Sequence, residues 1–110
     1  MSSNRVNDPN AVERARELAR GTLAGELDPL LACRDLAALR TRLAGVPEGA
    51  MDTFIAVASE VDDLPIGSDR QYWAPAALSA KDAEAADYRT RVKDVVLAAM
   101  KELLDAVGHV

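Results

Sequence analysis

Apolar residues recur along most of the chain at spacings of three and four, which is the period of one face of an α-helix. Four segments carry this pattern: residues 9–24, 29–44, 48–63 and 79–107. The alternation that is typical of a half-buried strand does not occur, and there is no internal repeat. The pattern predicts an all-α fold, in the form of a small four-helix bundle-like domain with a long loop before the last helix.

Two of these helices have a clear starting signal. Asp8 and Asp28 are each followed by a proline, so a side-chain acceptor stands directly before a residue that suits the first helical position. The first helix is therefore predicted to begin at Pro9 and the second at Pro29.

Glycine, proline and serine mark the other boundaries. Gly45 and Pro47 stop the second helix, and Pro65 ends the third because it forces the residue before it out of helical geometry. Before the last helix, Pro75 is expected to break the chain and Ser79 to act as the N-cap.

The 110 residues suit one domain, which we place over residues 9–108 after a flexible tail over residues 1–8. The last helix has so broad an apolar arc that we expect contact with several helices, or with a second subunit in a homodimer. No apolar run reaches a bilayer-spanning length and the start of the chain lacks a signal peptide, so no membrane partner is predicted. The lone Cys33 allows no internal disulfide, which favours the cytoplasm.

The net charge of −5 is concentrated in one segment. Residues 48–69 contain acidic residues and no basic one, whereas acids and bases nearly balance on either side. Such a segment repels phosphate, so nucleic acid is not an expected partner. It would attract a cation or a basic protein partner.

The residues that usually carry catalysis are scarce. Cys33 is the single cysteine, and the single histidine, His109, stands at the end of the chain. A Cys–His pair and a zinc site are therefore not expected. We predict no catalytic residue, no metal ligand and no cofactor, which favours a protein that is not an enzyme.

Two charged residues fall inside apolar arcs when each helix is projected as a wheel. Arg40 lies among the apolar positions of the second helix, and Asp62 among those of the third. One interpretation is that both are partly buried and paired, with each other or with Arg70, since a lone buried charge costs several kcal/mol. The other is that the third helix frays before Asp62, which then reaches solvent.

The stretch over residues 64–78 contains Arg70 and the only tryptophan, Trp73. Exposed Arg and Trp side chains are common at binding hot spots, but Trp73 could equally close one end of the bundle. Just before this loop, Glu60 and Asp63 share the outer face of the third helix with Asp52. This face is either ordinary solvated charge or a patch for a cation or a basic partner.

A string at this point resembles a family of small, mostly uncharacterised bacterial helical proteins. The string reads Ser59-Glu60-Val61-Asp62-Asp63-Leu64-Pro65-Ile66-Gly67, with Arg70 and Trp73 following. The segment from Cys33-Arg34 to Leu39-Arg40 is similar as well, and the resemblance extends over residues 11–105. It implies a small bacterial protein encoded as the partner of another, and it brings no catalytic residue.

Two functions follow from these observations. The first is a non-enzymatic interaction module that binds a protein partner, as immunity proteins and antitoxins do. The alternative is a small-molecule or metal-binding domain, or a small enzyme, with a site near Glu60, Asp62, Asp63 and Arg70. General acid–base chemistry at such a site would need a carboxylate with a raised pKa.

Overall fold

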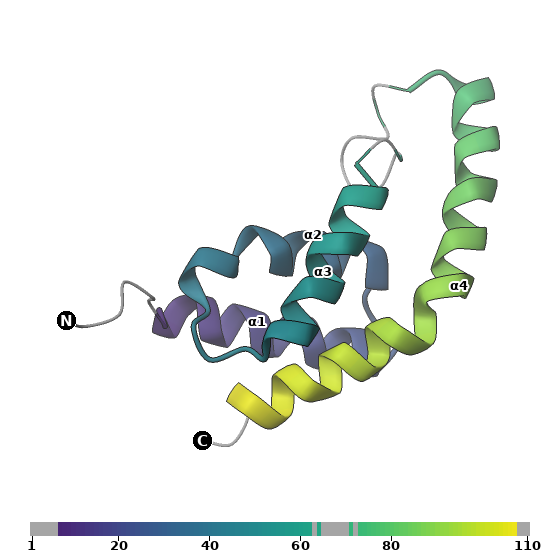
Figure 1. Cartoon of the computed structure of the whole chain (residues 1–110). Helices are drawn as coiled ribbons and strands as arrows, with labels where there is room; N and C mark the ends of the chain where they lie inside the picture. Colours follow the sequence, from purple (N-terminus) through teal and green to yellow (C-terminus); the bar gives the residue numbers. More distant parts are fainter. Residues whose placement is uncertain (1–6, 63, 65–70, 72, 108–110) are drawn as a thin grey trace.

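The computed structural model describes residues 7–62, 64, 71 and 73–107. Over these residues the chain forms four α-helices, one short 3-10 turn and no strand, which confirms the all-α prediction (Figure 1). None of the described helices is both long enough and apolar enough to cross a bilayer. The elements in chain order are α1 (Pro9–Leu23), α2 (Pro29–Ala38), η1 (Arg40–Arg42), α3 (Glu48–Glu60) and α4 (Pro75–Val107).

The first two helices begin where the sequence predicts. The carboxylate of Asp8 accepts a hydrogen bond from the backbone N–H of Asn10 at 2.9 Å, and α1 starts with the proline between them. Asp28 does the same for α2, accepting from the N–H of Leu30 at 3.0 Å. Each cap satisfies a backbone donor that the first helical turn leaves without a partner.

The second and third helices end earlier than predicted. The N–H of Leu39 bonds to the carbonyl of Leu36 at 3.0 Å, so the last turn of α2 tightens and passes into η1. Leu43, which lies within the predicted helical segment 29–44, is buried, but it reaches the core from beyond the end of α2. The third helix stops at Glu60 instead of continuing to residue 63, with Val61 as its C-cap.

The last helix starts earlier than predicted, at Pro75 instead of after Ser79. The N–H of Leu78 donates to the carbonyl of Ala74 at 2.9 Å, which closes the first helical turn ahead of Ser79. Proline is compatible with this position because the first-turn N–H has no helical partner in any case. Pro75 thus begins α4, and the loop before it ends at Ala74.

The start of the described chain is also fixed by hydrogen bonds. Asn7 forms an isolated antiparallel bridge with Leu43, and the N–H of Asp8 donates to the carbonyl of Arg42 at 3.0 Å. Residues 7 and 8, which the prediction includes in the tail over residues 1–8, are therefore hydrogen-bonded to the segment that follows α2. The remainder of that predicted tail lies outside the described residues.

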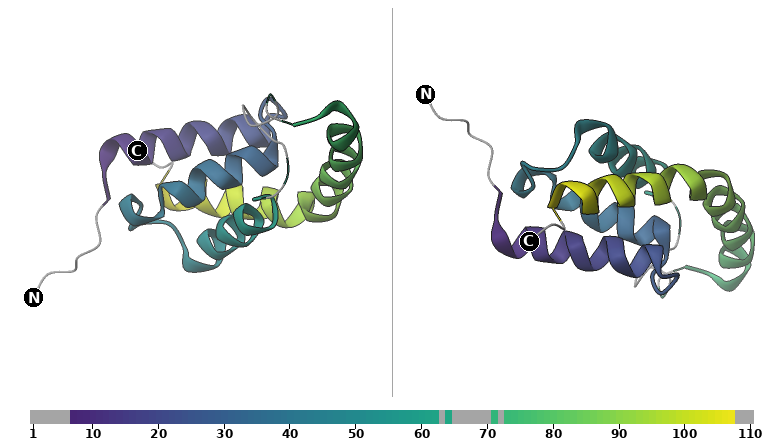
Figure 2. Two further views of the ribbon diagram at one scale, coloured as in Figure 1. Left: turned by 90° about the horizontal axis from the view of Figure 1, so that it is seen from above. Right: turned by 90° about the horizontal axis from the view of Figure 1, so that it is seen from below.

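The core lies where the second half of α4 meets the other three helices. The helix α2 packs chiefly on α3, and α1 packs chiefly on α4, whose end lies beside the first turns of α1 (Figure 2). Contact of α4 with several helices is thus confirmed, and contact with a second subunit stays a prediction. The broad apolar arc of this helix is not buried throughout, since Val95 is 52% exposed. The largest fully buried side chains include Leu30, Leu36, Phe54, Met100 and Leu103.

The helix α4 bends near its middle, and its first half stands away from the other helices (Figure 1). The hydroxyl of Thr90 donates to the carbonyl of Ala86 at 3.0 Å, a side-chain bond that often accompanies helix bending. Beside it, Arg89 donates to both carboxylate oxygens of Asp28, at 3.0 and 2.9 Å. The middle of α4 is therefore tied to the N-cap of α2.

Candidate functional site

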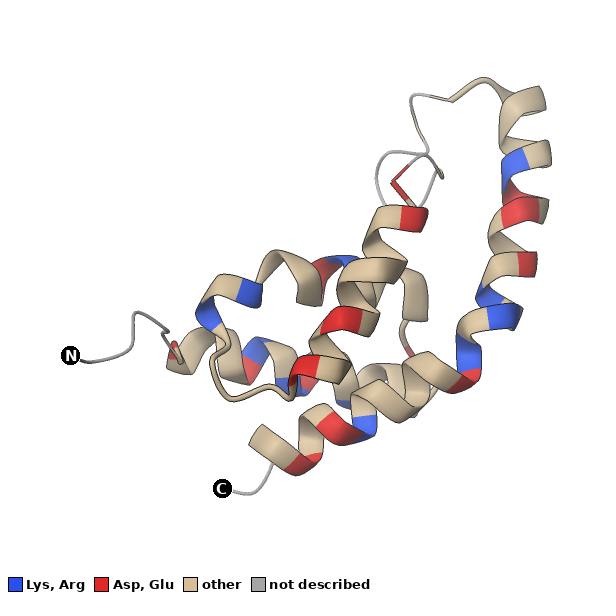
Figure 3. Cartoon of the chain, viewed as in Figure 1, with Lys and Arg blue, Asp and Glu red and all other residues tan. Residues whose placement is uncertain are grey.

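The exposed side of α3 is negatively charged. Glu48, Asp52 and Glu60 are exposed, and we call these three residues the acidic face. Figure 3 shows acidic residues spread along α3 with no basic residue among them. Two turns separate Asp52 from Glu60, and the exposed side chains of Ala56 and Ser59 between them are small. The segment Glu48–Glu60 contains no basic residue, so no positive charge on α3 itself offsets the acidic face.

The carboxylates of the acidic face lack partners within the described chain. None of the three forms an ion pair or a side-chain hydrogen bond with another described residue. Several acids elsewhere are paired: the Asp8 carboxylate lies 2.7 Å from Arg42, and the Asp28 carboxylate 2.9 Å from Arg89. The three carboxylates are therefore exposed and form no ion pair with a described residue, although Arg91 of α4 lines the same hollow as Glu60.

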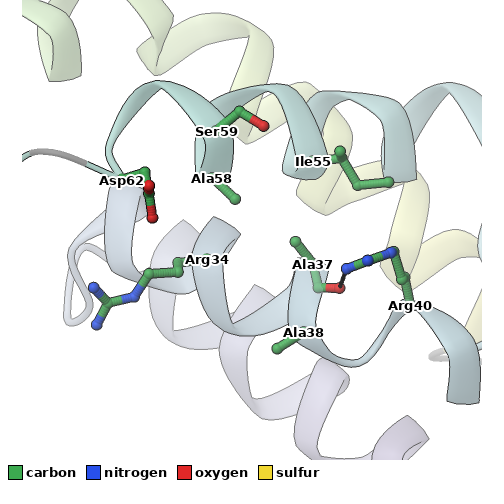
Figure 4. Close-up of a pocket in the computed structure, with 8 residues that line it drawn as sticks. All are labelled: Arg34, Ala37, Ala38, Arg40, Ile55, Ala58, Ser59 and Asp62. Carbon is green, nitrogen blue, oxygen red and sulfur yellow. Dashed lines mark hydrogen bonds between the residues drawn. The ribbon is translucent and has the colours of Figure 1, made fainter.

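An open groove of about 580 Å³ runs between α2 and α3 (Figure 4). Ala37 and Ala58 point between the two helices and form its floor, and Ala38 and Ile55 also line it. Polar residues stand along its two sides: Arg34 and Arg40 on the side of α2, Ser59 and Asp62 on the side of α3. The groove is thus basic along one side and acidic at the end of the other.

Arg40 and Asp62 line this same groove, but they do not pair. Both side chains are exposed, and they lie at opposite ends of the groove in Figure 4. A guanidinium N–H of Arg40 donates instead to the carbonyl of Ala37 at 2.9 Å. The expectation of partial burial and mutual pairing is wrong because α2 and α3 end before these residues, so neither lies on the helical wheel. Asp62 reaches solvent, as the second interpretation held.

Of the site residues that the sequence suggested, only Arg40 and Asp62 line the same groove. The others are Glu60, Asp63, Arg70 and Trp73. Glu60 is exposed and lines a small hollow with Tyr88 of α4, away from Arg40. Trp73 is partly buried two residues before the start of α4, and its role as a binding residue or as the closure of the bundle stays a prediction. Asp63 and Arg70 lie outside the described residues, and so does any pairing of Asp62 with Arg70.

The described residues offer little for catalysis. They include no group of three or more His, Cys, Asp or Glu side chains placed to hold a metal ion. Burial raises the pKa of the Cys33 thiol to about 12, and the charge of Asp28 adds to this, so the thiol is protonated at neutral pH. Burial and the nearby charge of Glu60 also raise the pKa of Tyr88. Neither group is activated as a base or a nucleophile.

Sequence reasoning missed most of the groove itself. Its floor residues were assigned to no site, although Ala37, Ala38 and Ala58 stand where α2 and α3 approach each other. A cluster of small residues at the edges of two neighbouring apolar arcs is the signal that could have indicated a shallow surface there.

Comparison of the chain with protein-family models, with curated proteins and with solved structures finds no match.

Proposed function

We propose that this protein is a non-enzymatic interaction module that binds a protein partner with a basic surface, in the manner of immunity proteins and antitoxins. The observation that carries the proposal is the acidic face of α3, whose carboxylates have no partner within the described chain. Lysine and arginine side chains of a partner would supply the missing positive charge. Such complementarity speeds association and selects among partners.

The position of Glu60 supports this proposal. It stands at the last residue of α3, where the carbonyl groups already give the helix end a partial negative charge. A carboxylate there is unfavourable for the isolated helix, typically by about 0.3–1 kcal/mol before screening by solvent. The negative charge at this end therefore does not stabilise α3, but it would favour contact with a basic surface.

The predictions from the sequence about architecture, origin and location are also part of this proposal. The four helices would act as a bundle-like support that presents α3 to the partner. The resemblance implies a bacterial protein, and the lone cysteine favours the cytoplasm. A homodimer through α4 stays a prediction, which sedimentation at several protein concentrations would test.

To test the proposal, the 110-residue chain is immobilised and exposed to its native lysate at low salt. Proteins retained at low salt and released at high salt are identified by mass spectrometry, and each is then purified to measure its Kd. The decisive variant is Asp52→Lys/Glu60→Lys. The matched control is Asp94→Lys/Glu102→Lys, which makes the same charge change at exposed positions of α4.

We expect the α3 variant to weaken binding of the purified partner at least tenfold and the α4 variant to leave its Kd within about twofold. Equal weakening by both variants would mean that only the total charge matters, and would refute a site on α3. Retention of no protein at low salt would refute the proposal as a whole.

A further inference from the structure

The shape of the groove between α2 and α3 suits a segment of a protein better than a small molecule. Small-molecule sites usually enclose most of the ligand surface. This groove is open along its length, and the short side chains of Ala37 and Ala58 form its shallow floor (Figure 4). Side chains this short let another backbone approach closely.

The backbone chemistry of the groove favours a helix as that segment. Both walls are helices, whose N–H and C=O groups bond within the helix, and the described part of this chain offers no strand edge for an incoming strand. A bound segment must therefore satisfy its own backbone, as an α-helix does. The axes of packed helices lie closer when the side chains between them are small.

The charges beside the groove differ between its two sides. On the side of α2, the exposed guanidinium of Arg40 lies at one end, held by the carbonyl of Ala37. On the side of α3, Asp62 lies at the other end and Asp52 of the acidic face follows on the exposed side of the helix. A bound helix meets the fewest like charges if it carries bases toward α3 and acids toward α2.

We infer that the groove between α2 and α3 receives an α-helix of the partner protein, with small side chains facing the floor, a basic flank over α3 and an acidic flank over α2. This inference rests on the proposed function, because it specifies how a basic partner would meet the acidic face. It adds that the partner helix has an acidic side as well, which attraction to α3 alone does not require.

The test uses synthetic stapled helices of roughly 20 residues, about 30 Å long. All carry alanine and serine on one face. The first has lysine on one flank and glutamate on the other, the second has lysine on both flanks, and the third glutamate on both. Their Kd values for the 110-residue chain are measured by fluorescence anisotropy at low salt.

The variant Ala38→Trp places a large side chain at the edge of the groove from an exposed position, so that it obstructs a bound helix without disturbing the core. Ala98→Trp is the matched control, at an exposed alanine of α4 that is outside the groove. Circular dichroism and thermal melts establish that both variants fold like the parent chain.

We expect the lysine–glutamate helix to bind at least fivefold more tightly than either of the others. Ala38→Trp should weaken its binding at least tenfold, and Ala98→Trp less than twofold. Tightest binding by the lysine-only helix would overturn the inference and leave the proposed function standing. Binding of no helix, or equal binding to both tryptophan variants, would overturn the inference as well.

Discussion

The carboxylates at the starts of α1 and α2 differ sharply from those on α3. Asp8 and Asp28 each accept a backbone N–H and also pair with a distant arginine, Arg42 and Arg89 respectively. The acids of α3 do neither within the described chain. The first pair therefore contributes to the fold, whereas the acids of α3 are available for an interaction outside it.

The largest effect is expected at Asp28. The variant Asp28→Ala removes the N-cap of α2 and leaves Arg89, at the bend of α4, without its carboxylate. Caps contribute about 1 kcal/mol, and hydrogen bonds between charged groups add to this, less the screening at a site that is only partly buried. We expect the free energy of unfolding to fall by about 2 kcal/mol, as measured by urea denaturation.

Asp28→Asn divides this loss into its parts, because the amide oxygen can still cap α2 but the charge that pairs with Arg89 is gone. It should retain part of the stability. If Asp28→Ala unfolds at the same urea concentration as the parent chain, the Asp28 carboxylate does not stabilise the fold. The contrast with the acids of α3 would then be wrong.

A smaller loss is expected at Asp8. Asp8→Ala removes the N-cap of α1 and the contact with Arg42, but both lie at the solvent-facing start of the chain's first helix. Solvent screens such pairs, so we expect a lower urea midpoint than the parent chain and a higher one than Asp28→Ala. If the urea midpoint of Asp8→Ala were below that of Asp28→Ala, Asp8 would contribute more to stability than Asp28, which would contradict this prediction.

The contribution of Asp8 should also depend on pH. The hydrogen bonds from Arg42, with that from the N–H of Asn10, hold the pKa of the Asp8 carboxyl below its ordinary value of 3.8. A carboxyl with a lowered pKa stabilises the fold above that ordinary value, and the effect is lost as the pH falls through the folded-state pKa. The difference in urea midpoint between the parent chain and Asp8→Asn should therefore shrink from pH 6 toward about pH 2.5. A constant difference would show that the charge of Asp8 does not contribute.

The smallest effects are expected on α3. Glu60→Gln removes a negative charge from the C-terminal end of the helix, so stability should stay the same or rise by a few tenths of a kcal/mol. Glu48→Gln is the matched control, because Glu48 lies in the first turn, where the same change should lower stability slightly. A loss above about 0.5 kcal/mol in Glu60→Gln would indicate that this acid has a structural role.

Local signals predicted the parts of the fold that depend on neighbouring residues. The starts of α1 and α2 are correct because a cap acts over two or three positions, as Asp8 and Asp28 do. The predicted start of α4 is wrong because a proline can either end a helix or begin one, and the sequence around Pro75 fits both.

The candidate site was less predictable, because it depends on residues that are distant in the sequence. The pairing of Arg40 with Asp62 followed from extending two helical wheels a few residues past the true helix ends. The sequence could not predict which acids pair with a base, because the partners can be far apart in the chain. Asp28 and Arg89, for example, are separated by 61 residues. The concentration of acidic charge was visible in the sequence, but its lack of partners required the fold.

The bend in α4 has a consequence for how this helix opens. Among residues 75–87 only Ala85 is buried, whereas the second half contributes Val96, Met100 and Leu103 to the core. Amide protons report local opening, which is easiest where little apolar surface holds a segment in place. Deuterium should therefore replace the amide protons of the first half well before those of the second. One unbroken helix would then consist of two cooperative units that meet where Arg89 is fastened to Asp28.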